Sequence, residues 1–255
     1  MSIERVLTSL RYLYQGEDFE FESQVYARDG ERRSLYRVLL LFLLRPGTQD
    51  KPLVYVCTSL FEKFPRPEDL LNLQNTEVIL RVISPVGHST HKLKLIRDAA
   101  IYCIQNRDRG DSGCARLGKR IGLWRRKRFY PNTLEYAMAY GCGRPGLPID
   151  GDSMRVLFRT SDRIDRSSFD YGKTGKKLKK ALNPKEWIDV HEILRLHGLV
   201  VCQTYPRCHL CPIEFCRMRE KPFHEQTGIQ IARQEAKRIL DEEWKPWRNL
   251  ACVTK

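Results

Sequence analysis

The sequence has no long apolar run, and this absence argues against a membrane protein. The longest apolar stretch, Val38 to Leu44, is far shorter than the roughly 20 residues that a membrane-spanning helix needs. Met1 to Gln15 mixes Glu4, Arg5 and Arg11 into an amphipathic pattern, unlike the apolar centre of a cleavable signal. We therefore expect no membrane association and a cytoplasmic location, at the nucleoid if the source is a prokaryote.

Acidic residues are fewer than basic ones. The chain carries 45 Lys and Arg against 31 Asp and Glu, which gives a formal net charge of +14. The excess is spread along the sequence rather than gathered in a tail. Such a balance favours a polyanionic partner, with nucleic acid ahead of membrane. A merely soluble basic protein is the alternative that charge alone leaves open.

Strict alternation of apolar and polar residues is missing too, so the sequence does not predict half-buried strands. No internal repeat or low-complexity tract is evident. Helical periodicity dominates, and 42% of the residues are hydrophobic, enough for one large domain or two lobes. We predict an all-α protein with helices over 2–14, 32–45, 52–63, 67–72, 76–84, 90–105, 130–141, 151–160, 171–181, 184–197 and 227–243. Arg107 to Arg128 is irregular and rich in Gly and Arg, which predicts a loop or short helix.

Four of the nine cysteines gather in one short segment. Cys202, Cys208, Cys211 and Cys216 are separated by gaps of five, two and four residues. This density indicates a metal centre in a reducing compartment rather than a set of disulfides. Zinc and a four-iron cluster both use four cysteine ligands, and the spacing alone does not separate them.

The segment around these cysteines resembles the endonuclease III superfamily of DNA glycosylases. NPKEWIDVHEILRLHGLVVC, Asn183 to Cys202, is similar to the helix that leads into the family's iron–sulfur loop, and His197-Gly198 and Pro212 extend the similarity. Two of the three gaps are one residue shorter than is usual. The resemblance implies a [4Fe-4S] cluster held by the four cysteines, with zinc as the alternative. It also implies the two-lobed, all-α helix-hairpin-helix glycosylase fold.

Upstream, LPIDGDSMRVLFR (Leu147 to Arg159) resembles the family segment in which the catalytic aspartate begins a helix. The match assigns that aspartate to Asp150 and the following arginine to Arg155, a DNA-binding residue in our prediction. Breaking an N-glycosidic bond builds positive charge on the sugar, and a fixed carboxylate stabilises it. An aspartate at this position is also a good helix cap, which is the alternative role of Asp150.

Family members that cut the abasic site use a lysine that attacks the sugar. The corresponding position here is Tyr130 or Pro131. Tyr130, which we assign to the catalytic site, resembles the residue in thymine-mismatch glycosylases, and this favours a hydrolase without lyase activity. Lys127 lies three residues earlier and leaves lyase activity open. The family's glycine-rich hairpin turn is replaced by Arg125, Arg126, Lys127 and Arg128, side chains that we expect to contact DNA phosphates.

Three further residues are predicted to contact DNA. Ser34 to Lys51 resembles the family's first buried helix and the loop that enters the base stack, which makes Arg45 and Gln49 candidates. Leu41 stands where the adenine glycosylase has glutamate, so adenine is not the expected substrate. The pattern from Val86 to Lys92 also follows the family, and Lys92 is a candidate phosphate contact.

Together these features predict a central lobe over 30–145 and an iron–sulfur lobe formed by 1–29 and 146–255. The expected function is a monomeric, monofunctional DNA glycosylase of base excision repair. Its expected substrate is double-stranded DNA with a lesion or mismatch, and uracil or thymine is the base we predict. The enzyme would act on a nucleotide extruded from the helix, because a stacked base is out of reach. The alternative is a protein that kept the fold and binds DNA without catalysis.

Overall fold

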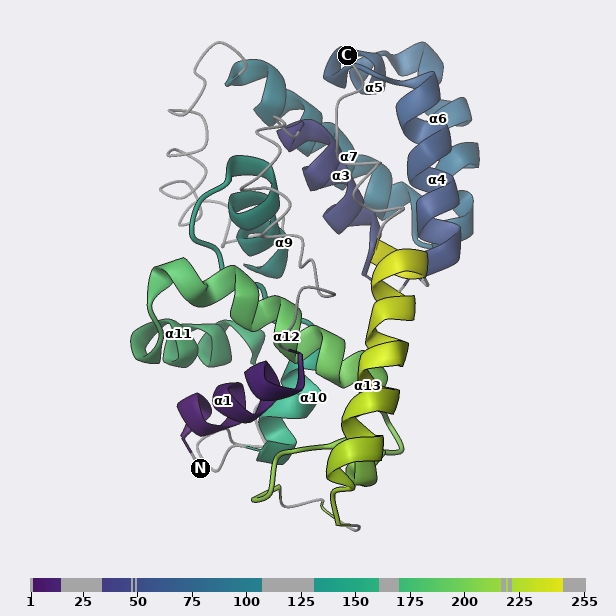
Figure 1. The fold of residues 1–255 in the computed structure, drawn as a ribbon. Helices are drawn as coiled ribbons and strands as arrows, with labels where there is room; N and C mark the ends of the chain where they lie inside the picture. Colours follow the sequence, from purple (N-terminus) through teal and green to yellow (C-terminus); the bar gives the residue numbers. More distant parts are fainter. Residues whose placement is uncertain are drawn as a thin grey trace. The chain divides into compact units, whose positions relative to one another are not determined.

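The computed structural model of the protein describes residues 2–14, 34–46, 48, 50–106, 131–160, 170–216, 219 and 222–244. Within these residues the structure is helical and contains no strand, so the all-α prediction is confirmed (Figure 1). None of the helices found in these ranges is long and apolar enough to cross a membrane.

The chain divides into two compact units, each with its own hydrophobic core. One unit comprises Met1–Gly30 and Leu147–Trp244, and the other comprises Glu31–Gly146 and Lys245–Lys255. We refer to them as the cysteine-loop unit and the central unit.

The central unit is built around an apolar helix, α3 (Leu35–Leu44). Seven of its ten residues are buried, and a helix that is apolar on nearly all sides belongs in a core. Ser34 caps it by accepting the backbone N–H of Arg37. Helices α4 (Asp50–Lys63), α7 (Ser89–Gln105) and α9 (Pro131–Tyr136) pack against it, and α9 continues as a π-helical turn over Ala137–Gly141. Helices α5 (Pro67–Leu71) and α6 (Thr76–Ile83) pack against α7.

The cysteine-loop unit consists of α1 (Ile3–Leu13), α10 (Gly151–Thr160), α11 (Tyr171–Ala181), α12 (Trp187–Val200) and α13 (Glu225–Ile239), with a π-helical turn over Leu240–Trp244. Helices α1, α10 and α13 all pack against α12, and Figure 1 shows α1 and α10 beside it. The N-terminal helix therefore shares a core with segments almost 200 residues later. Val6, Leu10, Met154, Leu194 and Leu196 are fully buried in this core.

Helices α10 and α12 approach each other closely at Gly198. A Cβ placed on Gly198 would lie 2.8 Å from both Cβ and the carbonyl oxygen of Asp152, closer than real side-chain contacts. Only glycine allows this approach. The contact brings the beginning of α10, where Asp150 lies, against the end of α12, which leads into the cysteine loop.

Candidate active site and cysteine pocket

Asp150 immediately precedes α10 and is held at two atoms. Its Oδ1 accepts the backbone N–H of Ser153 at 2.8 Å, the contact expected of a helix cap. Its Oδ2 lies 3.3 Å from Nε of Arg195, and the two side chains are only 16% and 11% exposed. The carboxylate is thus fixed in orientation and largely shielded from solvent, at the positive end of a helix dipole.

Arg195 is a residue of this site that the sequence analysis missed. It lies on α12, between the buried Leu194 and Leu196. The signal was present in the sequence, because Arg195 interrupts the apolar run from Ile193 to Leu196. A charged residue inside such a run has to find a polar partner in the folded unit.

Arg155 was predicted to contact DNA, but its guanidinium is directed into its own unit. Nε donates to the carbonyl of Cys202 at 2.7 Å, and Nη2 donates to the carbonyl of Gly198 at 2.8 Å. Nη2 also pairs with Oδ1 of Asp152 at 2.5 Å. Because these contacts hold α10 to the start of the cysteine loop, we leave Arg155 out of the proposed DNA contacts.

Lys92 is also used inside its own unit. Its side chain is buried, and Nζ donates to the carbonyl oxygens of Leu44 and Val86 at 2.7 and 2.6 Å and to Oγ1 of Thr48 at 2.9 Å. These three acceptors engage all three protons of the ammonium group. Lys92 therefore ties the end of α3 to the following loop instead of reaching a phosphate. Burial lowers its pKa from the ordinary lysine value.

Of the other residues predicted to contact DNA, the structure describes only Arg45. Arg45 is half-buried at the C-terminal end of α3, and its carbonyl accepts the N–H of Thr48 at 2.9 Å. The remaining candidates lie outside the described residues: Gln49, Arg125, Arg126, Lys127, Arg128 and Tyr130. Their roles stay predictions.

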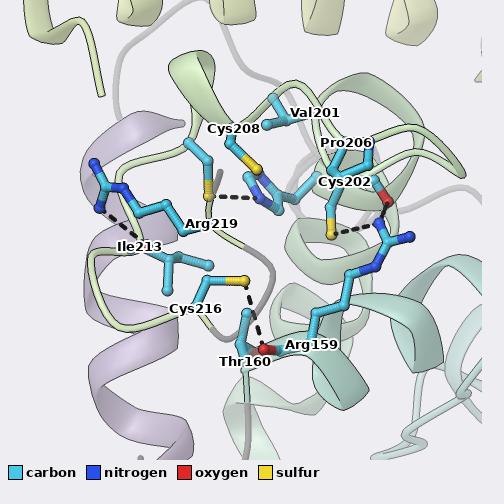
Figure 2. Close-up of a pocket in the computed structure, with 11 residues that line it drawn as sticks. Arg159, Thr160, Val201, Cys202, Pro206, Cys208, Ile213, Cys216 and Arg219 are labelled. Carbon is cyan, nitrogen blue, oxygen red and sulfur yellow. Dashed lines mark hydrogen bonds between the residues drawn. The ribbon is translucent and has the colours of Figure 1, made fainter. Parts of the chain in front are cut away.

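The four cysteines of the loop line one pocket. Cys202, Cys208, Cys211 and Cys216 share this partly open pocket with Arg159, Thr160, His197, Val201, Pro206, Ile213 and Arg219. Figure 2 shows the sulfur atoms of Cys202, Cys208 and Cys216 around this space. Among the described residues, no three His, Cys, Asp or Glu side chains are already close enough together to hold a single metal ion.

The pocket is apolar apart from a few polar side chains, and this affects the thiols. Burial raises the pKa of Cys211 to about 12 and also raises that of Cys202, where the nearby Arg159 acts in the opposite direction. Without a metal these thiols hold their protons at neutral pH. A metal that binds here has to displace the thiol protons. Metal binding by these cysteines is therefore coupled to proton release.

Arg159, at the end of α10, organises the first part of the loop. Its Nη1 lies 3.4 Å from Sγ of Cys202 and also donates to the carbonyl of Gln203, while Nη2 donates to the carbonyl of Thr204 at 3.0 Å. Figure 2 shows this side chain reaching toward Cys202. A guanidinium beside a sulfur stabilises the thiolate form that metal ligands adopt.

His197 contacts the pocket from the last turns of α12. Its Nε2 lies 3.5 Å from Sγ of Cys211, and its Nδ1 lies 3.2 Å from the hydroxyl of Tyr14, which directly follows α1. The backbone carbonyl of His197 accepts the N–H of Cys202 at 2.7 Å. Because the ring is fully buried, its pKa is lowered to about 3, and it is neutral at physiological pH. His197 thus contacts two of the four cysteines.

The arrangement of helices is the fold of endonuclease III and the helix-hairpin-helix DNA glycosylases. Two solved structures of endonuclease III with DNA, a trapped covalent intermediate and a non-covalent complex, each match with a TM-score of 0.64 at 18% sequence identity. Each match covers 85% of this chain and 96% of that one. A thermostable thymine-DNA glycosylase matches with a TM-score of 0.63 at 15% identity, over 86% and 97%. At these identities the likeness establishes the fold.

Searches at the level of sequence give no further support. No model of a known protein family and no curated protein matches this chain.

Proposed function

We propose that this protein is a DNA glycosylase that hydrolyses the N-glycosidic bond of a damaged or mismatched nucleotide extruded from DNA. The observation that carries the proposal is Asp150, a shielded carboxylate at the start of α10, held by Ser153 and Arg195 in a fold that solved DNA glycosylases share. The net charge of +14 suits a DNA partner.

The chemistry asks for a negative charge of fixed position. As the bond to the base breaks, positive charge develops on the sugar, and a preorganised anion stabilises it without having to reorient. Both oxygens of Asp150 are already engaged, so the carboxylate has little freedom to turn. It can also orient a water molecule for attack on the sugar carbon.

Uracil or thymine from a mismatch is the substrate we propose. The family's lysine position falls at Tyr130 or Pro131, and a tyrosine there resembles the thymine-mismatch glycosylases. Without that lysine the expected product is an intact strand with an abasic site. Lys127 is the nearest amine in the sequence that could form a Schiff base.

The test uses duplexes that each carry one lesion, including uracil or thymine opposite guanine, an oxidised pyrimidine and an alkylated purine. Products are resolved with and without alkali. We expect strand cleavage only after alkali with at least one duplex. Cleavage without alkali that Lys127→Ala abolishes indicates a lyase. Tight binding with no product from any duplex supports instead a protein that binds DNA and has lost catalysis.

We further propose that Cys202, Cys208, Cys211 and Cys216 hold a [4Fe-4S] cluster. The donor set fits, because four thiols from one loop face one pocket and Arg159 lies beside one of the sulfurs. Such a cluster would cross-link the loop and supply a redox centre.

Purified protein is then expected to be brown and to contain about four iron atoms per chain. Cys208→Ala should lose both iron and colour, whereas Cys57→Ala serves as a control, because Cys57 is buried in the core of the central unit. Colourless protein with one zinc ion per chain would identify the zinc alternative.

The basic segment at Arg125, Arg126 and Arg128 is proposed to contact DNA phosphates. Neutralising all three should flatten the dependence of DNA affinity on salt by up to about one unit of slope for each side chain. An unchanged slope removes this segment from the interface.

A further inference from the structure

Tyr14, His197 and Cys211 form a chain of contacts that the proposed glycosylase chemistry does not use. The residues come from the C-terminal end of α1, from α12 and from the cysteine loop. The contacts measure 3.2 Å from the Tyr14 hydroxyl to Nδ1 of His197 and 3.5 Å from Nε2 of His197 to Sγ of Cys211. Tyr14 is 3% exposed and His197 is fully buried. Both nitrogens of the imidazole ring therefore have a partner, and neither partner is a carboxylate.

We propose that Tyr14 and His197 form a hydrogen-bond relay that donates an N–H to the metal-bound thiolate of Cys211 and raises the reduction potential of the cluster. The inference rests on the proposed cofactor. Tyr14 and His197 are positioning residues in this account, because neither is a ligand.

The direction of the relay follows from the chemistry of the ligand. A metal-bound thiolate has no proton and can only accept, so Nε2 of His197 has to be the donor. A neutral imidazole carries one N–H, which leaves Nδ1 as an acceptor for the hydroxyl proton of Tyr14. With the metal absent, Cys211 is a thiol that can donate to Nε2, and both hydrogen bonds can then run the opposite way.

The expected effect on the cluster follows from charge. Reduction adds an electron, and hydrogen bonds to the thiolate sulfurs stabilise the more negative state. Cys202 lies beside the cationic Arg159 and Cys211 beside the neutral His197. The sulfur of Cys216 lies 3.5 Å from the carbonyl oxygen of Arg159, an acceptor that cannot stabilise a thiolate. Arg159 is thus placed to donate to Cys202 and His197 to Cys211, which also accepts the backbone N–H of Ile213. Removing the donor at either side chain lowers the potential.

The double variant Tyr14→Phe/His197→Phe removes the whole relay while retaining aromatic rings at both positions. Replacing both partners with apolar groups avoids leaving one buried polar group unsatisfied. Tyr14→Phe alone removes only the outer hydrogen bond. Tyr36→Phe is the matched control, because this similarly buried tyrosine lies in the core of the central unit and donates to the carbonyl of Phe64.

The measurements on the intact protein are iron content, visible spectrum and midpoint potential by voltammetry. We expect the double variant to keep its iron and to shift to a more negative potential. A loss of about tenfold in the equilibrium constant for reduction, the scale of one hydrogen bond to a charged group, is about 59 mV for one electron. Tyr14→Phe should shift less in the same direction, and Tyr36→Phe should not shift.

Two results would overturn the inference in different ways. If the wild-type protein holds a cluster and both relay variants retain its potential, the relay is wrong and the cofactor proposal stands. If the wild-type protein contains no iron after anaerobic purification, the cofactor proposal fails and the relay fails with it.

Discussion

Substituting alanine for Gly198 tests the close contact on which the candidate site depends. The added Cβ would lie 2.8 Å from Cβ and O of Asp152 and 2.9 Å from its carbonyl carbon. An ordinary contact begins near 3.4 Å, so α10 and α12 have to separate by about 0.6 Å. Overpacking of this kind typically costs about 1–3 kcal/mol of the free energy of unfolding.

Activity should fall as well. Asp150 precedes α10 and Arg195 lies on α12, so a separation of the two helices lengthens their 3.3 Å contact and releases the carboxylate. Chemical denaturation gives the free energy of unfolding, and single-turnover cleavage gives the rate.

Gly151→Ala is the matched control, because its Cβ would meet nothing within 4 Å. Alanine should be neutral there, or stabilising by up to about 1 kcal/mol through helix propensity. If Gly198→Ala unfolds within about 0.5 kcal/mol of the wild type, the helices are not in the contact described and the reasoning fails.

Two further predictions concern buried polar side chains. Lys92→Met leaves two buried carbonyl oxygens without the ammonium group and should lower the free energy of unfolding by about 1–3 kcal/mol. Lys94 is exposed, so Lys94→Met should change the free energy of unfolding little. Equal effects of the two substitutions would contradict this role of Lys92. Because burial lowers the pKa of His197 from 6.5 to about 3, the folded state binds fewer protons than the unfolded state between these values. The titration of His197 should therefore lower the free energy of unfolding by about 2 kcal/mol from pH 7 to pH 5. His197→Gln should lose this component while the exposed His91→Gln keeps it, and identical pH profiles for all three proteins would count against it.

Local patterns predicted the helices well. The expected helices at 151–160 and 171–181 coincide with α10 and α11, because capping aspartates and apolar spacing mark their boundaries. Asp150 and Asp170 each accept a backbone N–H three residues later. The helix expected to end at His197 continues to Val200. Gly198 lies within this helix, and its missing side chain allows the close packing of α10 against α12.

The contacts of the charged side chains could not be predicted from local patterns. Lys92 and Arg155 follow family patterns that suggested DNA contacts, and both are used to hold backbone carbonyls within their own unit. Leu44 lies 48 residues from Lys92 and Cys202 lies 47 residues from Arg155, so no local pattern predicts these contacts. Arg195 and Tyr14 also contact residues distant in the chain. Of the two, Arg195 has a local signal, because it interrupts the apolar run from Ile193 to Leu196.

The contacts of the cysteine loop could be predicted only in part. Its spacing predicted that four thiols would come together, and all four line one pocket. The spacing could not reveal Arg159, whose guanidinium reaches Cys202 from a different helix, or the contact of His197 with Cys211. Those contacts depend on how α10 and α12 pack.

The most direct test of the proposed function is the single-turnover rate of Asp150→Asn on the lesion that the wild type cleaves. Asparagine keeps the capping oxygen for Ser153, so folding and DNA binding should survive. Loss of one preorganised charge should reduce the rate at least about a hundredfold. Asp152→Asn removes an equal charge two residues away and should retain most of the activity. A rate for Asp150→Asn within about threefold of the wild type, or an inactive Asp152→Asn beside an active Asp150→Asn, would contradict the assignment of Asp150.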